Sequence, residues 1–323
     1  MSHEDGSRRA IVAAFLANLG IAVAKFVGFV VTGSASLAAE AIHSLADTGN
    51  QGLLFLGQAR ARRRPTDRHP FGFGSERYFW AFVVALVLFT GGGLFALFEA
   101  EEKLRHPHEL ESVPWAIGIL LVAVVLEGLS LRTAVRESVD EKEATGLSWF
   151  GFVRHSKRAE LTVVLLEDTG ALLGLGFALA GVTAAAVTGN ARFDALGSLG
   201  IGILLVVIAG VLATEMKSLL VGEGATPDQV AALRDAIDSH PAVRRVVGLR
   251  TLQLAPDELI VAAEADFDPA LGADAVARAI DEIEVEIRNR VPEADAGTVY
   301  IEPELAVPPS RLAVRRRRGR TPA

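Results

Sequence analysis

The chain of 323 residues contains no cysteine, and this absence sets the first limits on its chemistry. Disulfide bonds and thiolate metal sites are excluded, so a metal ion must be held by His, Asp, Glu, Asn or backbone oxygen. Such ligands suit zinc, manganese, iron and cobalt. The sequence also lacks a signal-peptide pattern at its start, a nucleic-acid-binding motif and the His-Glu-x-x-His motif of zinc metalloproteases. We therefore expect neither a nucleic-acid partner nor an enzyme.

Hydrophobic residues make up 50% of the chain, and the mean hydropathy is +0.35. This composition is too apolar for an ordinary soluble protein. Several apolar runs approach or exceed the roughly 18 residues expected of a helix that crosses a bilayer. The sequence predicts an α-helical membrane protein with six transmembrane helices, at about 10–31, 36–58, 78–97, 113–135, 158–187 and 193–220.

The net charge of −7 is unevenly distributed along the chain. The loop at 59–77 is strongly basic, and the segment at 136–158 also carries lysine and arginine. The positive-inside rule places both segments in the cytoplasm, and six spans then place both termini there. Without a targeting segment, the sequence favours a prokaryotic cytoplasmic membrane.

Ionisable residues interrupt the second predicted span, which contains Glu40, His43 and Asp47. An ionisable residue near the bilayer centre costs at least ~2.5–3.5 kcal/mol on insertion scales, so that several together need a reason. His43 and Asp47 are four residues apart, on one face of a helix and one turn from each other. Their imidazole nitrogen and carboxylate oxygen can bind one divalent cation such as zinc. The alternative is a His–Asp hydrogen bond that joins two helices.

The fifth predicted span repeats the pattern, with Glu167 and Asp168 set among valines and leucines. Polar insertions in two spans predict one intramembrane site built from both helices. A further acid, Glu127, lies in the fourth span. Three interpretations stay open for it: a proton carrier, a partner for Lys25 of the first span, or a member of a simple interhelical hydrogen bond.

The composition changes after residue 222, where a soluble domain begins. The periodicity predicts a helix up to residue 239, strands at 243–254 and 258–267, a helix at 272–290 and a strand at 298–302. The order αββαβ indicates a small ferredoxin-like α+β domain in the cytoplasm. The predicted division is therefore a six-helix cation-transport domain at 1–222, a dimerisation domain at 223–305 and a basic disordered tail at 306–323. Contact of this tail with anionic lipid headgroups is the alternative.

Several motifs together resemble the cation diffusion facilitator family over nearly the whole chain. They are the six spans, the His-x-x-x-Asp of the second span, the loop signature His69-Pro70-Phe71-Gly72 and the small α+β domain. The stretches GSASLAAEAIHSLADTGNQGLL, HPFGF, VVLLEDTGALLG and FDALGSLGIG are similar to the zinc transporter 9-like branch of that family.

The resemblance implies a homodimer in the lipid bilayer that exports divalent cations, usually zinc, by proton antiport and alternating access. It implies two metal ligands from the second span, His43 and Asp47, and two from positions 164 and 168. Asp168 fits this pattern, but Val164 cannot bind a metal ion. Glu167 is the nearest substitute, although it lies about 100° around the helix from Asp168. Other candidates for the fourth ligand are water, Glu40 and Glu127.

Two further metal sites of the family are incomplete in this sequence. In the loop after the second span His69 is present, but Phe73 stands where a second histidine is usual and Asp67 is displaced. The usual ligand positions of the cytoplasmic domain read Val247, Ala262 and Tyr300. We therefore expect this domain to serve dimer contact rather than metal sensing, and we interpret His240 as a residue at a helix end.

The sequence-based mechanism uses His43, Asp47 and Asp168 both as metal ligands and as proton-coupling groups. Binding needs a neutral imidazole and ionised carboxylates, so that metal binding is linked to proton release. The transported ion is expected to be Zn²⁺, with Mn²⁺, Fe²⁺ and Co²⁺ as alternatives, and no prosthetic group is expected. Two other hypotheses stay open: a non-transporting membrane scaffold or metal-responsive partner, and an intramembrane metalloenzyme.

Overall fold

The computed structural model describes residues 11–304 except 13–14, 17, 25, 28–29, 31–34, 108–112, 146–147 and 297. The basic tail and Lys25 lie outside the described residues. The chain divides into two compact units, Met1–Leu220 and Val221–Ala323, and each is described by itself.

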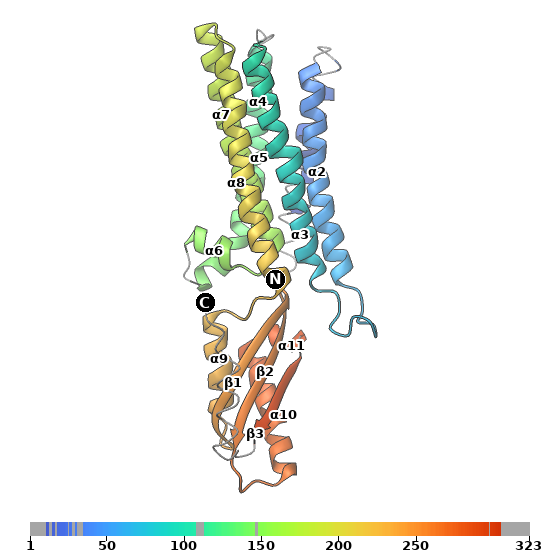
Figure 1. The fold of residues 1–323 in the computed structure, drawn as a ribbon, viewed down its shortest axis with the longest axis vertical. Helices are drawn as coiled ribbons and strands as arrows, with labels where there is room; N and C mark the ends of the chain where they lie inside the picture. Colours follow the sequence, from blue (N-terminus) through green and yellow to red (C-terminus); the bar gives the residue numbers. More distant parts are fainter. Residues whose placement is uncertain are drawn as a thin grey trace. The chain divides into compact units, whose positions relative to one another are not determined.

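The first unit is built of long helices whose axes lie roughly along one common line (Figure 1). The described residues between 11 and 30 are helical. The helices that follow are α2 (Ala35–Ala61), α3 (Glu76–Val87), the π-helix η1 (Leu88–Leu94), α4 (Phe95–Arg105), α5 (Val113–Thr145), α6 (Trp149–His155), α7 (Ala159–Thr188) and α8 (Arg192–Val221).

Within the described residues, 4 helices are long and apolar enough to cross a membrane. They are Glu76–Arg105, which joins α3, η1 and α4, and Val113–Val139, Ala159–Thr188 and Arg192–Val221. These correspond to the third to sixth predicted spans. The spans predicted at 10–31 and 36–58 stay predictions, so the total of six does too.

The segment Gly91-Gly92-Gly93 lies inside η1, where the sequence predicts a kink or a close helix contact. The close contact is present, because this part of the helix lies against α8, and the segment is also wound as a π-helix. A Cβ atom added at Gly93 would lie 2.8 Å from Cγ2 of Val206 and 3.2 Å from its backbone nitrogen. Glycine at position 93 therefore allows η1 and α8 to touch backbone to backbone.

Span three, the helix formed by α3, η1 and α4, carries an ion pair at each end. Near its start, the Arg77 guanidinium donates two hydrogen bonds to the Glu160 carboxylate of α7, and both side chains are buried. Near its end, Nζ of Lys103 lies 3.1 Å from a carboxylate oxygen of Asp194 in α8 and 3.0 Å from one of Glu99. Span three is thus tied to α7 at one end and to α8 at the other.

The charged segment at 136–158 is mostly helical. Helix α5 continues to Thr145, well past the apolar run, because the added residues are mainly good helix formers such as Glu, Lys and Arg. The short helix α6 begins where the Ser148 hydroxyl accepts a hydrogen bond from the Gly151 amide at 3.1 Å. The Lys142 ammonium lies 5.5 Å from the centre of the Trp149 ring, a cation–π contact that joins α5 and α6.

The second unit has the predicted order αββαβ, with one additional short helix. Its elements are α9 (Pro227–Asp238), β1 (Val243–Ala255), β2 (Glu258–Phe267), α10 (Ala273–Arg290), α11 (Glu293–Ala296) and β3 (Val299–Glu304). Strand β2 is central; it pairs with β1 in antiparallel and with β3 in parallel orientation. Thr226 and Gln229 form a capping box at the start of α9, with Pro227 in the first turn.

The core of the second unit lies between the sheet and the helices α9 and α10, which also contact each other. Its fully buried large side chains are Leu233, Ile237, Leu259, Ile283 and Ile287. On the other face of the sheet, Arg250 pairs with Ala262 and Ala262 pairs with Tyr300, so that these residues form one row across the strands.

Candidate metal centre

Helix α2 carries the second-span candidates Glu40, His43 and Asp47. The helix is continuous through these positions, so His43 and Asp47 lie one turn apart on one face, as predicted. The side chains of all three residues lie outside the described residues. Their role as ligands therefore stays a prediction.

Asp168 of α7 is a candidate ligand whose side chain the structure describes. Its side chain is buried, with 1% exposed. The Ser130 hydroxyl of α5 lies beside the carboxyl. Neither the Ser130 Oγ nor the Asp168 Oδ2 makes a hydrogen bond of ordinary geometry within the described part of the chain. A buried carboxylate oxygen without a donor is costly, so this position suits a group that is neutralised by a cation or a proton.

Ser130 differs from other hydroxyl residues of the helical unit. In a transmembrane helix, Ser and Thr commonly satisfy their hydroxyl by donating to the backbone carbonyl four residues earlier. Five hydroxyls of this unit do so: those of Thr90, Thr133, Ser138, Thr188 and Thr214. The Ser130 hydroxyl has no such bond. Its proton is therefore free to be donated across the α5–α7 contact, towards Asp168.

Glu167 faces a different neighbour from Asp168. Its Oε1 accepts a hydrogen bond from Asn50 Nδ2 at 3.0 Å, and its Oε2 accepts one from Gln51 Nε2 at 2.8 Å. Both donors belong to α2, whereas the Ser130 hydroxyl beside Asp168 belongs to α5. The two adjacent acids thus point to different helices, in keeping with the expected separation of about 100° around the helix axis.

Val164 and Glu127 are the remaining candidates of the helical unit. Val164 is fully buried in the apolar core, where its side chain offers no donor atom to a metal ion. Glu127 is also buried, on α5 and three residues before Ser130. Its carboxylate lies on the side of the helix that carries Ser130, since residues three apart share a face.

No group of three or more His, Asp and Glu side chains is gathered tightly enough for a metal ion among the side chains that the structure describes. In the loop after α2, the His69 ring stacks on the Phe73 ring with centroids 4.6 Å apart. In the second unit, Val247, Ala262 and Tyr300 are all exposed. Among these described residues, neither the loop positions nor the sheet positions form a set of metal ligands.

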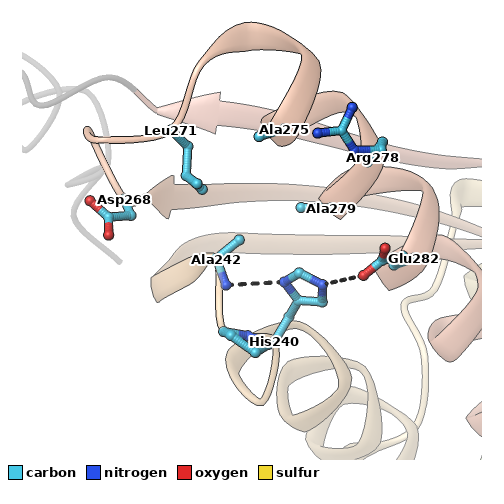
Figure 2. A pocket seen from close by; sticks show the side chains of 9 residues that line it. His240, Ala242, Asp268, Leu271, Ala275, Arg278, Ala279 and Glu282 are labelled. Carbon is cyan, nitrogen blue, oxygen red and sulfur yellow. Dashed lines mark hydrogen bonds and ion pairs between the residues drawn. The ribbon is translucent and has the colours of Figure 1, made fainter.

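His240 follows α9 directly and uses both ring nitrogens in hydrogen bonds. Nδ1 accepts from the Ala242 amide at 3.2 Å, and Nε2 lies 3.0 Å from a carboxylate oxygen of Glu282 (Figure 2). Figure 2 shows that Asp268 and Arg278, which line the same cavity, lie apart from the imidazole. The residue therefore links the end of α9 to α10, which agrees with its interpretation as a helix-end residue.

Sequence reasoning missed Asn50, Gln51 and Ser130. A signal for them was present, because an amide or hydroxyl residue inside an apolar span has to find a polar partner. It was weaker than the signal from the acids, since neutral polar residues cost less in a membrane and occur there more often.

The long apolar helices and the buried carboxylates define a multi-pass membrane protein with an added α+β domain. The chain belongs to the cation efflux family. The cation efflux transmembrane domain matches residues 11–221, and the cation efflux protein cytoplasmic domain matches residues 225–304. This confirms the resemblance to the cation diffusion facilitator family.

The most informative relatives carry the name proton-coupled zinc antiporter SLC30A9, mitochondrial. The protein from Xenopus laevis is 38% identical over 244 residues, which are 76% of this chain and 44% of the relative. The protein from Homo sapiens is 37% identical over 244 residues, 76% of this chain and 43% of the relative. A probable cation efflux system protein of Mycobacterium tuberculosis is 28% identical over 287 residues, 87% of this chain and 79% of the relative. The chain thus spans less than half the length of the first two relatives.

Proposed function

We propose that the protein is a divalent cation exporter, with zinc as its main substrate and protons as the counter-ion. The observation that carries this proposal is the buried Asp168 carboxylate of α7, with Oδ2 lacking a hydrogen bond in the described part of the chain. The proposal is further supported by relatives named proton-coupled zinc antiporters that are 37–38% identical to this chain.

The proposed ligands are His43 and Asp47 of α2 and Asp168 of α7. Imidazole and carboxylate ligands suit zinc, and also manganese, iron and cobalt. Val164 offers no donor, and both carboxylate oxygens of Glu167 already accept hydrogen bonds from α2. Each carboxylate oxygen has a second acceptor position, so the candidates for a fourth ligand are Glu167, Glu40, Glu127 and water.

The coupling to protons follows from the chemistry of these ligands. Metal binds the neutral imidazole and the ionised carboxylates, so that loading the site releases protons and protonation expels the metal. His43, Asp47 and Asp168 are the proposed coupling groups. An unperturbed imidazole has a pKa of about 6.5, which makes His43 suited to this role at physiological pH.

The proposed topology has six spans with both termini in the cytoplasm, because the loop at 59–77 is strongly basic. The proposed location is a prokaryotic cytoplasmic membrane, and the proposed assembly is a homodimer joined through the α+β unit. Neither an enzymatic activity nor a nucleic-acid partner forms part of the proposal.

The test uses the purified full chain in sealed liposomes that contain a zinc-sensitive dye and carry an imposed pH gradient. The Asp168→Asn variant keeps the shape of the side chain and removes its charge. We expect gradient-dependent zinc flux in the wild type and its loss in this variant. A Glu101→Gln variant is the control, because it removes one carboxylate charge from an exposed ion pair with Arg105 in α4.

The alternative function is a non-transporting membrane scaffold or metal-responsive partner, which the lack of a donor at Val164 favours. It predicts that a folded, dimeric wild type moves neither zinc nor manganese, iron or cobalt. It also predicts that His43→Ala changes no phenotype. Flux that disappears with Asp168→Asn would rule it out.

A further inference from the structure

Four buried polar side chains form a chain of hydrogen bonds across three helices. Asn18 Nδ2 donates to Gln51 Oε1 at 3.4 Å, and Gln51 Nε2 donates to Glu167 Oε2 at 2.8 Å. Asn50 Nδ2 donates to Glu167 Oε1 at 3.0 Å. None of the four residues is more than 8% exposed. We refer to Asn18, Asn50, Gln51 and Glu167 as the amide network.

The direction of each hydrogen bond in the amide network follows from its chemistry. Gln51 turns its oxygen towards the amide of Asn18, so that its NH₂ group is the part that faces Glu167. An amide NH₂ group can only donate, and both oxygens of Glu167 accept. This is the arrangement of an ionised carboxylate held by two donors, and such charge-assisted bonds are stronger than neutral ones.

The amide network joins α2 and α7 close to the proposed ligands of both helices. Asn50 and Gln51 lie three and four residues after Asp47, one helical turn away on the same side of α2. Glu167 is the direct neighbour of Asp168. Helix α2 packs along α3, whereas α7 packs along α5 and α8. The bonds to Glu167 are therefore a direct polar link between two helices whose main packing partners differ.

From this arrangement we infer that Asn50, Gln51 and Glu167 are positioning residues for the metal centre. They hold α2 and α7 in register, so that His43 and Asp47 on one helix face Asp168 on the other at the distance a small divalent cation needs. In this role Glu167 is a brace between helices and not a metal ligand. The inference rests on the proposed function and refines its ligand set.

A brace and a ligand make opposite demands on the carboxylate. A ligand or a proton carrier needs its carboxylate at position 167. A brace needs only a hydrogen bond between the two helices, and the donor can belong to either α2 or α7. The exchange Gln51→Glu with Glu167→Gln conserves total charge and nearly all atoms. The new carboxylate at position 51 accepts from Asn18 and from the new amide at position 167, whose oxygen accepts from Asn50.

The experiment measures zinc flux by the full chain in liposomes, as KM and Vmax. Loss of residues that orient metal ligands typically costs about 10–100-fold in metal affinity. We expect Gln51→Glu and Glu167→Gln alone to raise KM by about that factor and to change Vmax little. We expect the double exchange to return KM to within about threefold of the wild type. A double exchange as impaired as Glu167→Gln alone would overturn the inference, as would a single Glu167→Gln variant with wild-type KM.

A second pair of substitutions can be used if the first double variant does not fold. Asn50→Asp with Glu167→Gln also restores a donor opposite an acceptor, with Gln51 donating to the new amide at position 167. If the first double variant does not fold, the second is judged by the same KM criterion. A third measurement is independent of transport: in the thermal unfolding of the detergent-solubilised protein, the two single changes of each exchange must be non-additive.

The outcomes separate this inference from the proposed function. A wild type that moves no divalent cation overturns the proposed transport activity. The brace is then judged by the unfolding data alone, and additive effects would overturn it. A wild type that transports zinc, with exchanges that do not restore KM, overturns only the brace and returns Glu167 to the ligand set.

Discussion

At the scale of single residues, the buried Arg77–Glu160 pair is sensitive to the loss of either partner alone. Both charges are buried, with 7% and 1% of the side chains exposed. Removing one partner of such a pair leaves a buried charge uncompensated, which typically costs about 3–5 kcal/mol. We expect Glu160→Gln to lower the free energy of unfolding by about that amount, measured by denaturant or thermal unfolding in detergent.

The matched control for Glu160 is an ion pair at the surface. Arg105 and Glu101 are joined at 2.6 Å, but their side chains are 69% and 57% exposed. We expect Glu101→Gln to cost less than about 1 kcal/mol. Replacing both Arg77 and Glu160 by Met should recover most of the loss caused by Glu160→Gln. A Glu160→Gln variant as stable as Glu101→Gln would contradict the prediction.

Ser130 supplies a second prediction at this scale. Its hydroxyl lies beside the Asp168 carboxyl and has no bond to its own helix. A hydroxyl that orients a metal-binding carboxylate contributes about 10-fold or more to metal affinity. We expect Ser130→Ala to raise the KM for zinc by about 10-fold in the liposome assay. Ser138→Ala is the control, because this buried hydroxyl is satisfied by the Ala134 carbonyl oxygen; equal effects of both changes would refute a special role for Ser130.

The sequence predicted which acids belong to the candidate site. It did not predict which neighbouring helix each of them faces. Asp168 and Glu167 stand out because a charged residue in an apolar span is costly wherever it points. Which helix each one faces depends on the packing of α2, α5 and α7. The partners Asn50, Gln51 and Ser130 are neutral, so only the folded arrangement distinguishes them from other polar residues of the spans.

At the scale of elements, the π-helical segment η1 depends on its contact with α8. A Cβ added at Gly93 would lie 2.8 Å from Val206 Cγ2, whereas one added at Gly91 meets nothing within 4 Å. Overpacking of this kind costs about 1–3 kcal/mol. We expect Gly93→Ala to destabilise the helical unit by that amount and Gly91→Ala to leave it within ~0.5 kcal/mol of wild type or stabilise it, by thermal unfolding. Equal effects would show that η1 and α8 separate easily.

The β1–β2 hairpin carries a pH-dependent element. Burial raises the pKa of Glu258, the first residue of β2, above its ordinary value. The folded state thus holds this proton more tightly than the unfolded state, and the stabilisation is present below pH ~4.5 and lost as the pH rises through the folded pKa. We expect Glu258→Gln to raise the unfolding temperature of the α+β unit at pH 7 and to have little effect at pH 4. A rise of equal size at both pH values would indicate another cause.

Element boundaries were predicted best where periodicity and caps agree. The strand at 258–267 and the helix that starts after Thr226 are observed as predicted, because alternation and capping are local signals. The continuation of α5 to Thr145 was not predicted, since hydropathy marks where a helix leaves apolar surroundings and not where it ends. The glycines at 91–93 predicted a kink or a close helix contact; the contact with α8 is present, whereas the π winding has no local sequence signal.

At the scale of the whole molecule, the proposed dimer should not depend on metal. The positions at which the family resemblance implies ligands in this domain hold Val247, Ala262 and Tyr300, which are exposed and offer no good zinc donor. We expect EDTA to leave the molar mass of the detergent-solubilised protein unchanged at twice that of the chain, by light scattering after size exclusion. Halving of the mass on chelation would show that a metal ion bridges the subunits.

Span three links motions in different parts of the helical unit. Its two ends are fastened to different helices, by Arg77 to Glu160 of α7 and by Lys103 to Asp194 of α8. Any turn of α7 against α8 must therefore act on span three as torsion. The wide turn of η1 lies between the two fastened ends and has no side chains at 91–93 to resist unwinding. It is therefore the part of the span in which side chains oppose such torsion least.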